Sequence, residues 1–204
     1  MNIYGLLLAA GQSARMGQPK QLLSWRGQPL VAHVAKEALT VPLSGLVVVV
    51  GAAEDAVRSA LRDLPVTIVP NPDFAAGLST SLATGLRSLP ATADAALILL
   101  VDQPLVTARL IRQLINAYQS RPDVLAVIPR YHGQRGNPVI IAAPLFCELC
   151  QLSGDHGARI VLDRYADQIV WLDVDDPAVV TDVDTPAAWQ ALVGERKQLF
   201  DNNR

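Results

Sequence analysis

The chain has 204 residues, half of them hydrophobic and 18% charged, which suits one compact domain and excludes an intrinsically disordered chain. Its formal net charge of −2 at pH 7 argues against nucleic-acid binding, which normally needs a basic excess. No basic region precedes the first apolar run, and that run is too short to span a membrane, so we expect a cytoplasmic protein without a membrane partner.

The first apolar run, Ile3–Leu8, predicts a buried strand that opens into a glycine-bearing loop. The loop contains Gly11 and Gly17 together with two cations, Arg15 and Lys20. Glycine lets backbone N–H groups approach phosphate closely, arginine offers a bidentate fork, and lysine offers a compact charge. The P-loop and G-x-G-x-x-G patterns are both absent. We interpret the stretch as a polyphosphate-binding loop, and the alternative is a glycine-rich turn with surface cations.

Strand and helix patterns then alternate along the first 129 residues. The expected strands are Ile3–Leu8, Gly45–Val50, Val66–Val69, Ala95–Val101 and Val124–Pro129. The expected helices between them are Leu30–Leu39, Glu54–Leu64, Ser79–Leu89 and Thr107–Ser120. Nearly continuous apolar strands separated by helices indicate a mostly parallel sheet covered on both faces. The expected fold class is therefore α/β, a three-layer Rossmann-like sandwich.

Polar and small residues follow the third and fourth of these strands. Asn71 comes directly after the third strand, and Gly77, Ser79 and Ser81 lie where the next helix begins, so we expect them to contact a nucleotide base. Ser79 as an ordinary N-cap is the alternative. After the fourth strand comes Asp102, which is well placed to bind a divalent cation over a triphosphate, because ligands bind beyond the carboxyl ends of parallel strands. Its alternative role is to cap the following turn.

The pattern changes after residue 129. A polar loop precedes Pro138–Ala142, which we expect to form an antiparallel hairpin, and short helices are expected near Pro144–Leu152 and Ala158–Tyr165. A strand over Ile169–Leu172 and a closing helix from Pro186 follow, and residues 201–204 are expected to fray. We expect a single nucleotidyltransferase domain, 1–204, with a nucleotide-binding half of about 1–129, and with an acceptor-binding half and a closing metal motif within 130–204.

Several residues of the second half could bear chemistry. Asp184 stands before the closing helix and could complete a magnesium site with Asp102, although it could instead cap that helix. Asp182 shares a face with Asp184 on extended chain and is the weaker candidate. The turns that contain Arg135 and Asn137, and Asp155 and Arg159, combine glycine with polar or cationic groups, which we assign to the acceptor. The second turn could equally be a capped helix start, because Asp155 precedes a helical stretch.

Two further patterns are interpreted as structural. Cys147 and Cys150 form a C-x-x-C without a second ligand pair, so we expect packing rather than zinc binding. His132 and His156 lack metal-binding spacing, and we expect both to face solvent in loops.

Taken in order, these motifs resemble the molybdenum cofactor cytidylyltransferase family, within the MobA-like nucleotidyltransferases. The resemblance rests on Leu8–Lys20, Asn71, Gly77–Leu82, Asp102–Pro104, Arg135–Val139, Gly154–Arg159 and Asp184–Pro186. It implies a fold of the nucleotide-diphospho-sugar transferase type. It also implies magnesium-dependent transfer of CMP from CTP to the terminal phosphate of molybdenum-molybdopterin, with release of pyrophosphate. A recipient molybdoenzyme or its chaperone is the further partner implied.

Two positions bear on specificity within that resemblance. A guanylyl-transferring sister group usually has Leu-Ala-Gly-Gly where this chain has Leu8-Ala9-Ala10-Gly11, so Ala10 favours CTP. The family commonly has histidine where this chain has Asn137, which cannot carry charge near neutral pH. The alternatives are CTP- or GTP-dependent transfer to a different phosphorylated acceptor, or a non-catalytic carrier of the cofactor for molybdoenzymes.

The motifs and the resemblance together give the expected site residues. The catalytic set is Arg15, Lys20 and Asp102, and the metal ligands are Asp102 and Asp184. The nucleotide-binding set is Leu8, Ala9, Ala10, Gly11, Arg15, Lys20, Asn71, Gly77, Ser79, Ser81 and Asp102. The acceptor-binding set is Gln103, Pro104, Arg135, Asn137, Asp155 and Arg159.

Overall fold

A sheet of eight strands forms the centre of the computed structural model, which describes residues 1–121, 123–155 and 157–201. The strand order is β10-β7-β9-β6-β1-β4-β5, and β8 pairs with β7. These strands are β1 Ile3–Ala9, β4 Gly45–Val50, β5 Thr67–Pro70, β6 Ala95–Leu100, β7 Ala126–Tyr131, β8 Gln134–Arg135, β9 Val139–Ala142 and β10 Ile169–Asp173.

The sheet is mostly parallel, as predicted. β1 lies between β4 and β6 and runs parallel to both, and β5 and β10 also run parallel to their neighbours. β9 is antiparallel to both β6 and β7, and the short β8 turns back along β7. The expected antiparallel excursion after residue 129 is therefore inserted into the sheet itself, beside the strand that leads to Asp102.

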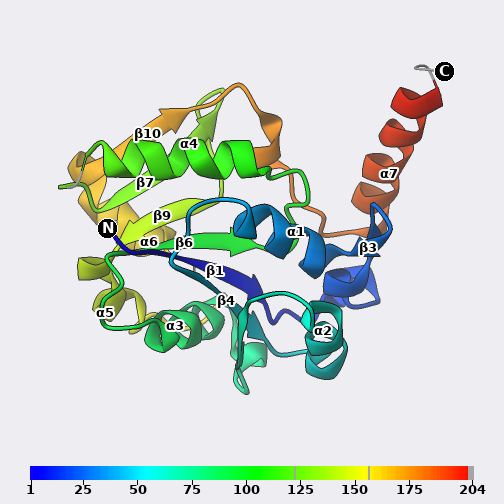
Figure 1. Cartoon of the computed structure of the whole chain (residues 1–204), viewed down its shortest axis with the longest axis horizontal. Helices are drawn as coiled ribbons and strands as arrows, with labels where there is room; N and C mark the ends of the chain where they lie inside the picture. The colour runs from blue at the N-terminus through cyan, green and yellow to red at the C-terminus, as the bar shows by residue number, and fades with distance from the viewer. Residues whose placement is uncertain (122, 156, 202–204) are drawn as a thin grey trace.

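Helices cover both faces of the sheet and make three layers (Figure 1). The helices are α1 Leu30–Leu39, α2 Glu54–Leu61, α3 Leu78–Ser88, α4 Ala108–Gln119, α5 Phe146–Leu149, α6 Arg159–Leu162 and α7 Pro186–Asp201. The larger apolar cluster lies between one face and α1, α2 and α4, whereas α3, α5 and α6 contribute to the cluster on the other face. Side chains of a strand alternate between the two faces of the sheet, and helices cover both faces, so the apolar strands are buried on both sides.

The last helix, α7, points away from the sheet (Figure 1). Near its start, Trp189 packs against Trp25, with ring centroids 5.7 Å apart, and Trp25 belongs to a two-stranded hairpin formed by β2 Ser24–Trp25 and β3 Gln28–Pro29. Sequence patterns did not predict this hairpin, because its strands have two residues each. Its packing against α7 helps to place the segment that contains Asp184 beside the first loop.

Several local predictions need correction. The helix expected over Ala158–Tyr165 is α-helical only in α6 and continues as a 3₁₀ segment, because Tyr165 has non-helical backbone angles. Cys150 is half-buried, but Cys147 is exposed, so packing explains only one of the two thiols. His132 is exposed in the β7–β8 turn, as expected. The expectations for His156 and for residues 202–204 fall outside the described residues, and α7 includes Asp201.

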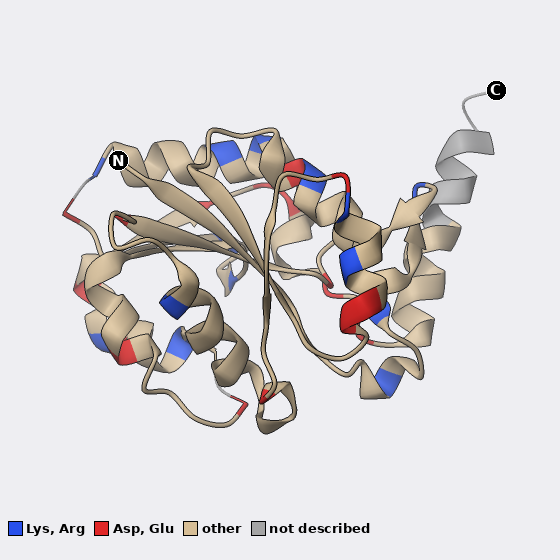
Figure 2. Cartoon of the chain, turned by 60° about the horizontal axis from the view of Figure 1, so that its bottom comes forward, with Lys and Arg blue, Asp and Glu red and all other residues tan. Residues whose placement is uncertain are grey.

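Charged residues are interspersed over the helices and loops of the described chain (Figure 2). Acidic and basic segments alternate along its surface, in agreement with a net charge of −2. A search of the described residues finds no helix that is both long and apolar enough to cross a membrane. Because the net charge is slightly negative, an anion site in this protein has to come from a local arrangement of donors.

Candidate active site

A cavity of about 510 Å³ lies at the carboxyl ends of β1 and β6, where a parallel sheet usually binds its ligands. It is enclosed by the loop after β1, by the turn before α3 and the start of that helix, by the end of β6 with the two residues that follow it, and by two single residues, Asp155 and Asp184. Its lining includes Leu8, Ala10–Arg15, Lys20, Phe74–Leu78, Ser81, Leu100–Asp102, Asp155 and Asp184. Five segments distant in sequence thus meet around one space.

The loop after β1 presents unpaired backbone donors to this cavity. Ser13 and Gly17 both have left-handed backbone angles, with φ of 55° and 70°, which turn the chain sharply on either side of a short 3₁₀ helix. Within the described chain, the backbone N–H groups of Gly11, Gln12 and Ser13 donate to no protein acceptor. Free N–H groups in a tight loop are suited to phosphate oxygens.

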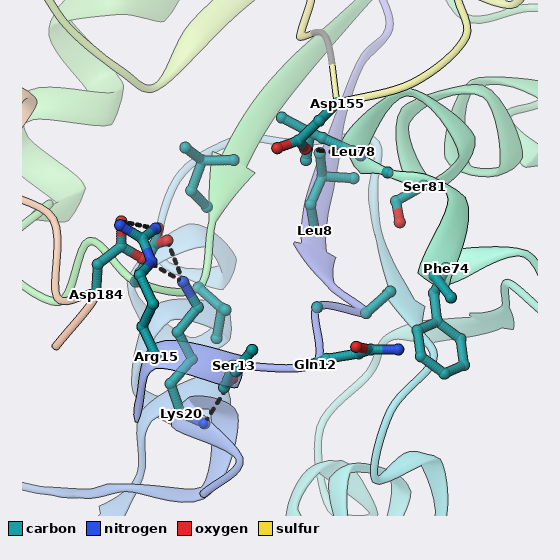
Figure 3. Close-up of a pocket in the computed structure, with 18 of the residues that line it drawn as sticks. Leu8, Gln12, Ser13, Arg15, Lys20, Phe74, Leu78, Ser81, Asp155 and Asp184 are labelled. Atoms are coloured by element: carbon teal, nitrogen blue, oxygen red, sulfur yellow. Dashed lines mark hydrogen bonds and ion pairs between the residues drawn. The ribbon is translucent and has the colours of Figure 1, made fainter. Parts of the chain in front are cut away.

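At one end of the cavity, Lys20 bridges two carboxylates (Figure 3). Its Nζ lies 2.6 Å from Oδ2 of Asp102 and 2.9 Å from Oδ1 of Asp184. Arg15 donates from Nη2 to the other oxygen of Asp184, at 2.9 Å. The structure therefore brings together the four charged residues that the sequence singled out, from positions up to 169 residues apart.

These contacts shift the pKa values of the charged groups. Burial lowers the pKa of Lys20, but the charges and hydrogen bonds of Asp102 and Asp184 outweigh it, so the net pKa lies above the ordinary value. For Asp184, burial raises the pKa, but the hydrogen bonds and charges of Lys20 and Arg15 outweigh burial. The net pKa of Asp184 therefore lies below the ordinary value. Both groups are consequently ionised at neutral pH.

The donor set fits a divalent cation. Oδ1 of Asp102 is buried and receives no hydrogen bond within the described chain, which is costly for a carboxylate oxygen unless a ligand completes its coordination. No group of three or more His, Cys, Asp or Glu residues suited to a metal is present among the described residues. Two carboxylates with phosphate oxygens are the usual ligands of magnesium. Asp102 and Asp184 could therefore bind a cation together with a triphosphate.

Asp182 and its neighbours are turned away from the cavity. Oδ1 of Asp182 accepts a hydrogen bond from Nε2 of Gln103 at 2.7 Å. Burial and the negative charges of Asp102 and Asp184 nevertheless raise the pKa of Asp182 above its ordinary value. Gln103 is buried, and so is Pro104, whose carbonyl lies 2.9 Å from Nε2 of His33. Neither lines the cavities that contain the other site residues. Their contacts link the chain after β6 to its neighbours, and the structure does not bring either residue to the other residues expected to bind the acceptor.

Of the residues expected to contact a base, only some reach the cavity. Gly77 and Ser81 line it, but Asn71 and Ser79 are buried and lie behind it. Asn71 donates from Nδ2 to the hydroxyl groups of Thr80 and Ser81, at 2.9 and 3.0 Å. The side chain of Asn71 is therefore bonded to α3 and does not line the cavity.

Ser79 connects α3 to a distant loop. Its hydroxyl donates to the carbonyl of Gly154 at 2.6 Å, and Asp155 accepts from the backbone N–H of Leu78 at 3.3 Å. Gly77, not Ser79, occupies the N-cap position of α3. Ser79 is therefore not the N-cap of α3, and it does not line the cavity. Its hydrogen bond joins the start of α3 to the loop that contains Asp155, and Asp155 lines the first cavity.

Gly77 is required where these two loops touch, and this gives a first prediction. Its φ is +116°, and a Cβ there would meet the backbone carbonyl of Gly154. We expect Gly77→Ala to lower the free energy of unfolding by about 2 kcal/mol or more, from backbone strain and the displaced loop. Thermal denaturation measures this effect. Gly133→Ala is the matched control, because it also has positive φ but open space around the Cβ. Equal losses in the two variants would contradict the steric argument.

A second cavity, of about 260 Å³, adjoins the first and shares Leu8, Leu78 and Leu100 with it. Of the residues expected to bind the acceptor, Arg135, Asn137 and Arg159 line it, whereas Asp155 lines the first cavity. Both guanidinium groups approach Asp163, Arg135 at 2.9 Å and Arg159 at 3.6 Å. The pocket therefore has an apolar floor and a cationic rim.

Sequence reasoning missed two residues that shape the first cavity. Phe74 lies in a 3₁₀ turn, Phe74–Ala76, and the side chain of Gln12 points toward its ring at the end of the cavity opposite Lys20 (Figure 3). An aromatic residue between a strand end and a glycine-led helix was the available signal. Ala9, which was expected to contact the nucleotide, is buried in β1 and does not line the cavity.

The comparisons with known proteins agree with this arrangement. Residues 5–169 match the family described as MobA-like NTP transferase domain. Nicotine blue oxidoreductase of Paenarthrobacter nicotinovorans is 33% identical over 192 residues, which are 90% of this chain and 92% of that protein. Molybdenum cofactor cytidylyltransferase of Escherichia coli K12 is 25% identical over 185 residues, 89% of this chain and 90% of that protein.

A solved structure adds a metal to these similarities. The Rv0371c protein of Mycobacterium tuberculosis H37Rv, in complex with manganese, superposes with a TM-score of 0.80 and 29% sequence identity. The alignment covers 94% of this chain and 98% of that one. A divalent metal is thus compatible with the fold. This agrees with the buried Oδ1 of Asp102, which has no hydrogen-bond partner in the described chain.

Proposed function

Because the chain belongs to the MobA-like NTP transferase domain family and is a nucleotidyltransferase, we propose that it transfers CMP from CTP to the terminal phosphate of molybdenum-molybdopterin. The products are molybdopterin cytosine dinucleotide and pyrophosphate. The observation that carries the proposal is the bridge of Lys20 between Asp102 and Asp184, directly beside a loop with free N–H groups. This arrangement suits a metal-bound triphosphate better than it suits any neutral ligand.

The polarity of the first cavity orients the nucleotide. Its charged end contains Lys20, Arg15 and the two carboxylates, whereas Phe74 and Ser81 lie at the other end (Figure 3). The triphosphate lies at the charged end, and the base lies near Phe74, where an aromatic ring and a hydroxyl group can contact it. Asp102 and Asp184 would hold a magnesium ion, which would neutralise charge on the phosphates.

The side chains of the protein then need only position the reacting phosphates and neutralise their charge. An oxygen of the acceptor phosphate forms a bond to the α-phosphorus of CTP, and the bond from that phosphorus to the bridging oxygen of pyrophosphate breaks. Lys20 and Arg15 stabilise the charge that develops on pyrophosphate. The attacking phosphate is already anionic, so no side chain has to remove a proton. Lys20 must exchange carboxylate partners for phosphate as the nucleotide binds.

The second cavity is the proposed acceptor site. Arg135 and Arg159 form a cationic rim suited to a phosphorylated acceptor, above an apolar floor suited to a flat heterocycle. The leucines shared by the two cavities put the acceptor next to the nucleotide. This supports the proposed division into a nucleotide-binding half, 1–129, and an acceptor-binding half, 130–204, although Asp155 of the second half also borders the first cavity.

Asn137 favours a second candidate, transfer to a different phosphorylated acceptor. It lines the acceptor pocket with a neutral amide, and its backbone N–H is tied to Val179 at 2.8 Å. A neutral side chain there contributes no charge toward an acceptor phosphate. A cofactor carrier is less well supported, since it has no need for the charged cluster around Lys20. A purely redox function, which the name of the relative nicotine blue oxidoreductase describes, is less well supported for the same reason.

Ala10 gives the prediction that tests nucleotide choice. Ala10 is only 2% exposed and lines the first cavity, so removal of its methyl group is expected to enlarge the space for a base. We expect Ala10→Gly to lower the ratio of kcat/KM for CTP to that for GTP by about tenfold, the usual effect of one methyl group in a pocket. Steady-state kinetics with each nucleotide measures the ratio. An unchanged ratio would show that Ala10 does not select the base.

The proposed function is tested by equilibrium binding before any chemistry is assayed. Calorimetry with Mg²⁺ and each of CTP, GTP, ATP and UTP should show tightest binding of CTP, and EDTA should weaken that binding. If GTP binds most tightly, the protein is a guanylyltransferase candidate. If none of the four binds, the assignment of the first cavity to a nucleotide is wrong.

A further inference from the structure

Gln21 is a completely buried polar residue next to the catalytic lysine, with an exposed fraction of 0%. A polar side chain is buried at such a place only when its hydrogen bonds are satisfied. We propose that Gln21 is a positioning residue, which fixes the loop after β1 in the conformation that binds the phosphates of the nucleotide. This role rests on the proposed function of that loop, and it goes beyond the residues that touch the ligand.

The amide group of Gln21 reaches both ends of the turn that follows β1. Nε2 donates one hydrogen to the carbonyl of Ala9, at 2.9 Å, and the other to the carbonyl of Gly11, at 2.7 Å. Its Oε1 accepts from the hydroxyl group of Ser13 at 3.4 Å. The oxygen of the same hydroxyl group accepts from the backbone N–H of Lys20 at 3.0 Å. One side chain thus organises the loop from its first residue to Lys20.

The planarity of the peptide bond turns these contacts into an orientation. In a trans peptide the carbonyl oxygen and the N–H of the next residue point in opposite directions. Because Gln21 holds the Gly11 carbonyl toward the protein interior, it directs the N–H of Gln12 the other way. Gln12 lines the cavity, and its N–H has no acceptor in the described chain. Gln21 therefore decides which side of the loop faces an anion.

The opposite orientation would be unfavourable for the ligand. If the Gly11 peptide rotated, its carbonyl oxygen would face the cavity and repel a phosphate instead of offering it a donor. Gln21 prevents this by supplying two donors where two carbonyl groups converge. Glutamate has nearly the same shape but loses both donors when ionised, and methionine has similar length with no donors at all. Gln21→Glu and Gln21→Met therefore remove the same function in two ways.

The test compares the affinity of the variants for CTP and for inorganic pyrophosphate, by calorimetry with Mg²⁺, and the kinetics of the full-length enzyme. We expect both variants to bind each ligand about tenfold or more weakly and to raise KM for CTP, with an unchanged KM for the acceptor. A merely structural role would lower the melting temperature and the active fraction but leave KM for CTP unchanged. Gln113→Met, at an exposed position of α4, is the matched control and should behave as wild type.

The outcomes separate this role from the proposed function. If the wild type binds CTP and a folded Gln21 variant binds it within twofold of wild type, the positioning role is overturned. If neither Gln21 variant folds, Ser13→Ala decides, because it leaves both Nε2 contacts of Gln21 in place and removes only the two hydrogen bonds of the Ser13 hydroxyl group. A threefold or larger loss of CTP affinity then supports the role, and an unchanged affinity overturns it. If the wild type binds neither CTP nor pyrophosphate, the proposed function fails and this role fails with it.

Discussion

Replacement of Lys20 by alanine should lower turnover at saturating CTP by about 10²-fold or more, the usual cost of removing one group that stabilises developing charge. In the described structure the Lys20 side chain is only 15% exposed, and its ammonium group lies between two carboxylates. Without it, Asp102 and Asp184 face each other with one cation fewer. Steady-state formation of pyrophosphate measures the loss, and Mg²⁺ titration shows whether metal dependence changes with it.

Lys36→Ala is the control for the lysine prediction. Lys36 is exposed on α1, where its Nζ contacts Oε1 of Gln28 at 2.6 Å, far from both cavities. Its replacement removes the same charge from the protein and should leave turnover unchanged. Near-normal turnover of Lys20→Ala would remove Lys20 from the mechanism.

Asp102→Asn should be the second severe loss, also of about 10²-fold or more in turnover. The substitution keeps the shape of the side chain but removes the charge that opposes Lys20 at 2.6 Å. It also replaces one carboxylate oxygen by an amide nitrogen, which cannot bind a cation. We therefore expect affinity for Mn²⁺ in the presence of CTP, measured by calorimetry, to fall together with turnover.

Asp63→Asn is the matched control for Asp102, because Asp63 is exposed beyond the end of α2 and lines neither cavity. Turnover and metal affinity should both equal those of wild type in this control. Loss of turnover in Asp102→Asn with unchanged metal affinity would show that the carboxylate acts through Lys20 rather than as a metal ligand. Normal turnover would contradict both roles.

The layers of the fold and the location of the site could be predicted because they follow from patterns that are local in sequence. Ile3–Leu8 and Ala95–Val101 are continuous apolar runs, which parallel strands require, and their carboxyl ends come together in any such sheet. Arg15, Lys20, Asp102 and Asp184 were recognised by residue type and position, and the structure brings all four together. The family similarity predicted from these motifs is confirmed by the match over residues 5–169.

The location of several other polar residues could not be predicted, because polar residues near a ligand have two possible roles that look alike in sequence. Asn71, Ser79 and Gln103 stand in motifs beside the site, but each of these side chains donates a hydrogen bond to another part of the protein. Gln21 shows the converse, since nothing in its neighbourhood distinguishes it from a surface glutamine. Only the fold shows that its amide group lies between two carbonyl groups of the loop.

The central claim is tested most directly by identifying the product of the reaction. The protein is incubated with Mg²⁺, molybdenum-loaded molybdopterin and one of CTP, GTP, ATP or UTP, and the mixture is separated by chromatography. We expect a cytosine dinucleotide to form with CTP, together with an equal amount of pyrophosphate, and little or no dinucleotide with the other three. Absence of any dinucleotide, in a protein that binds CTP and Mg²⁺, would contradict molybdopterin as the acceptor.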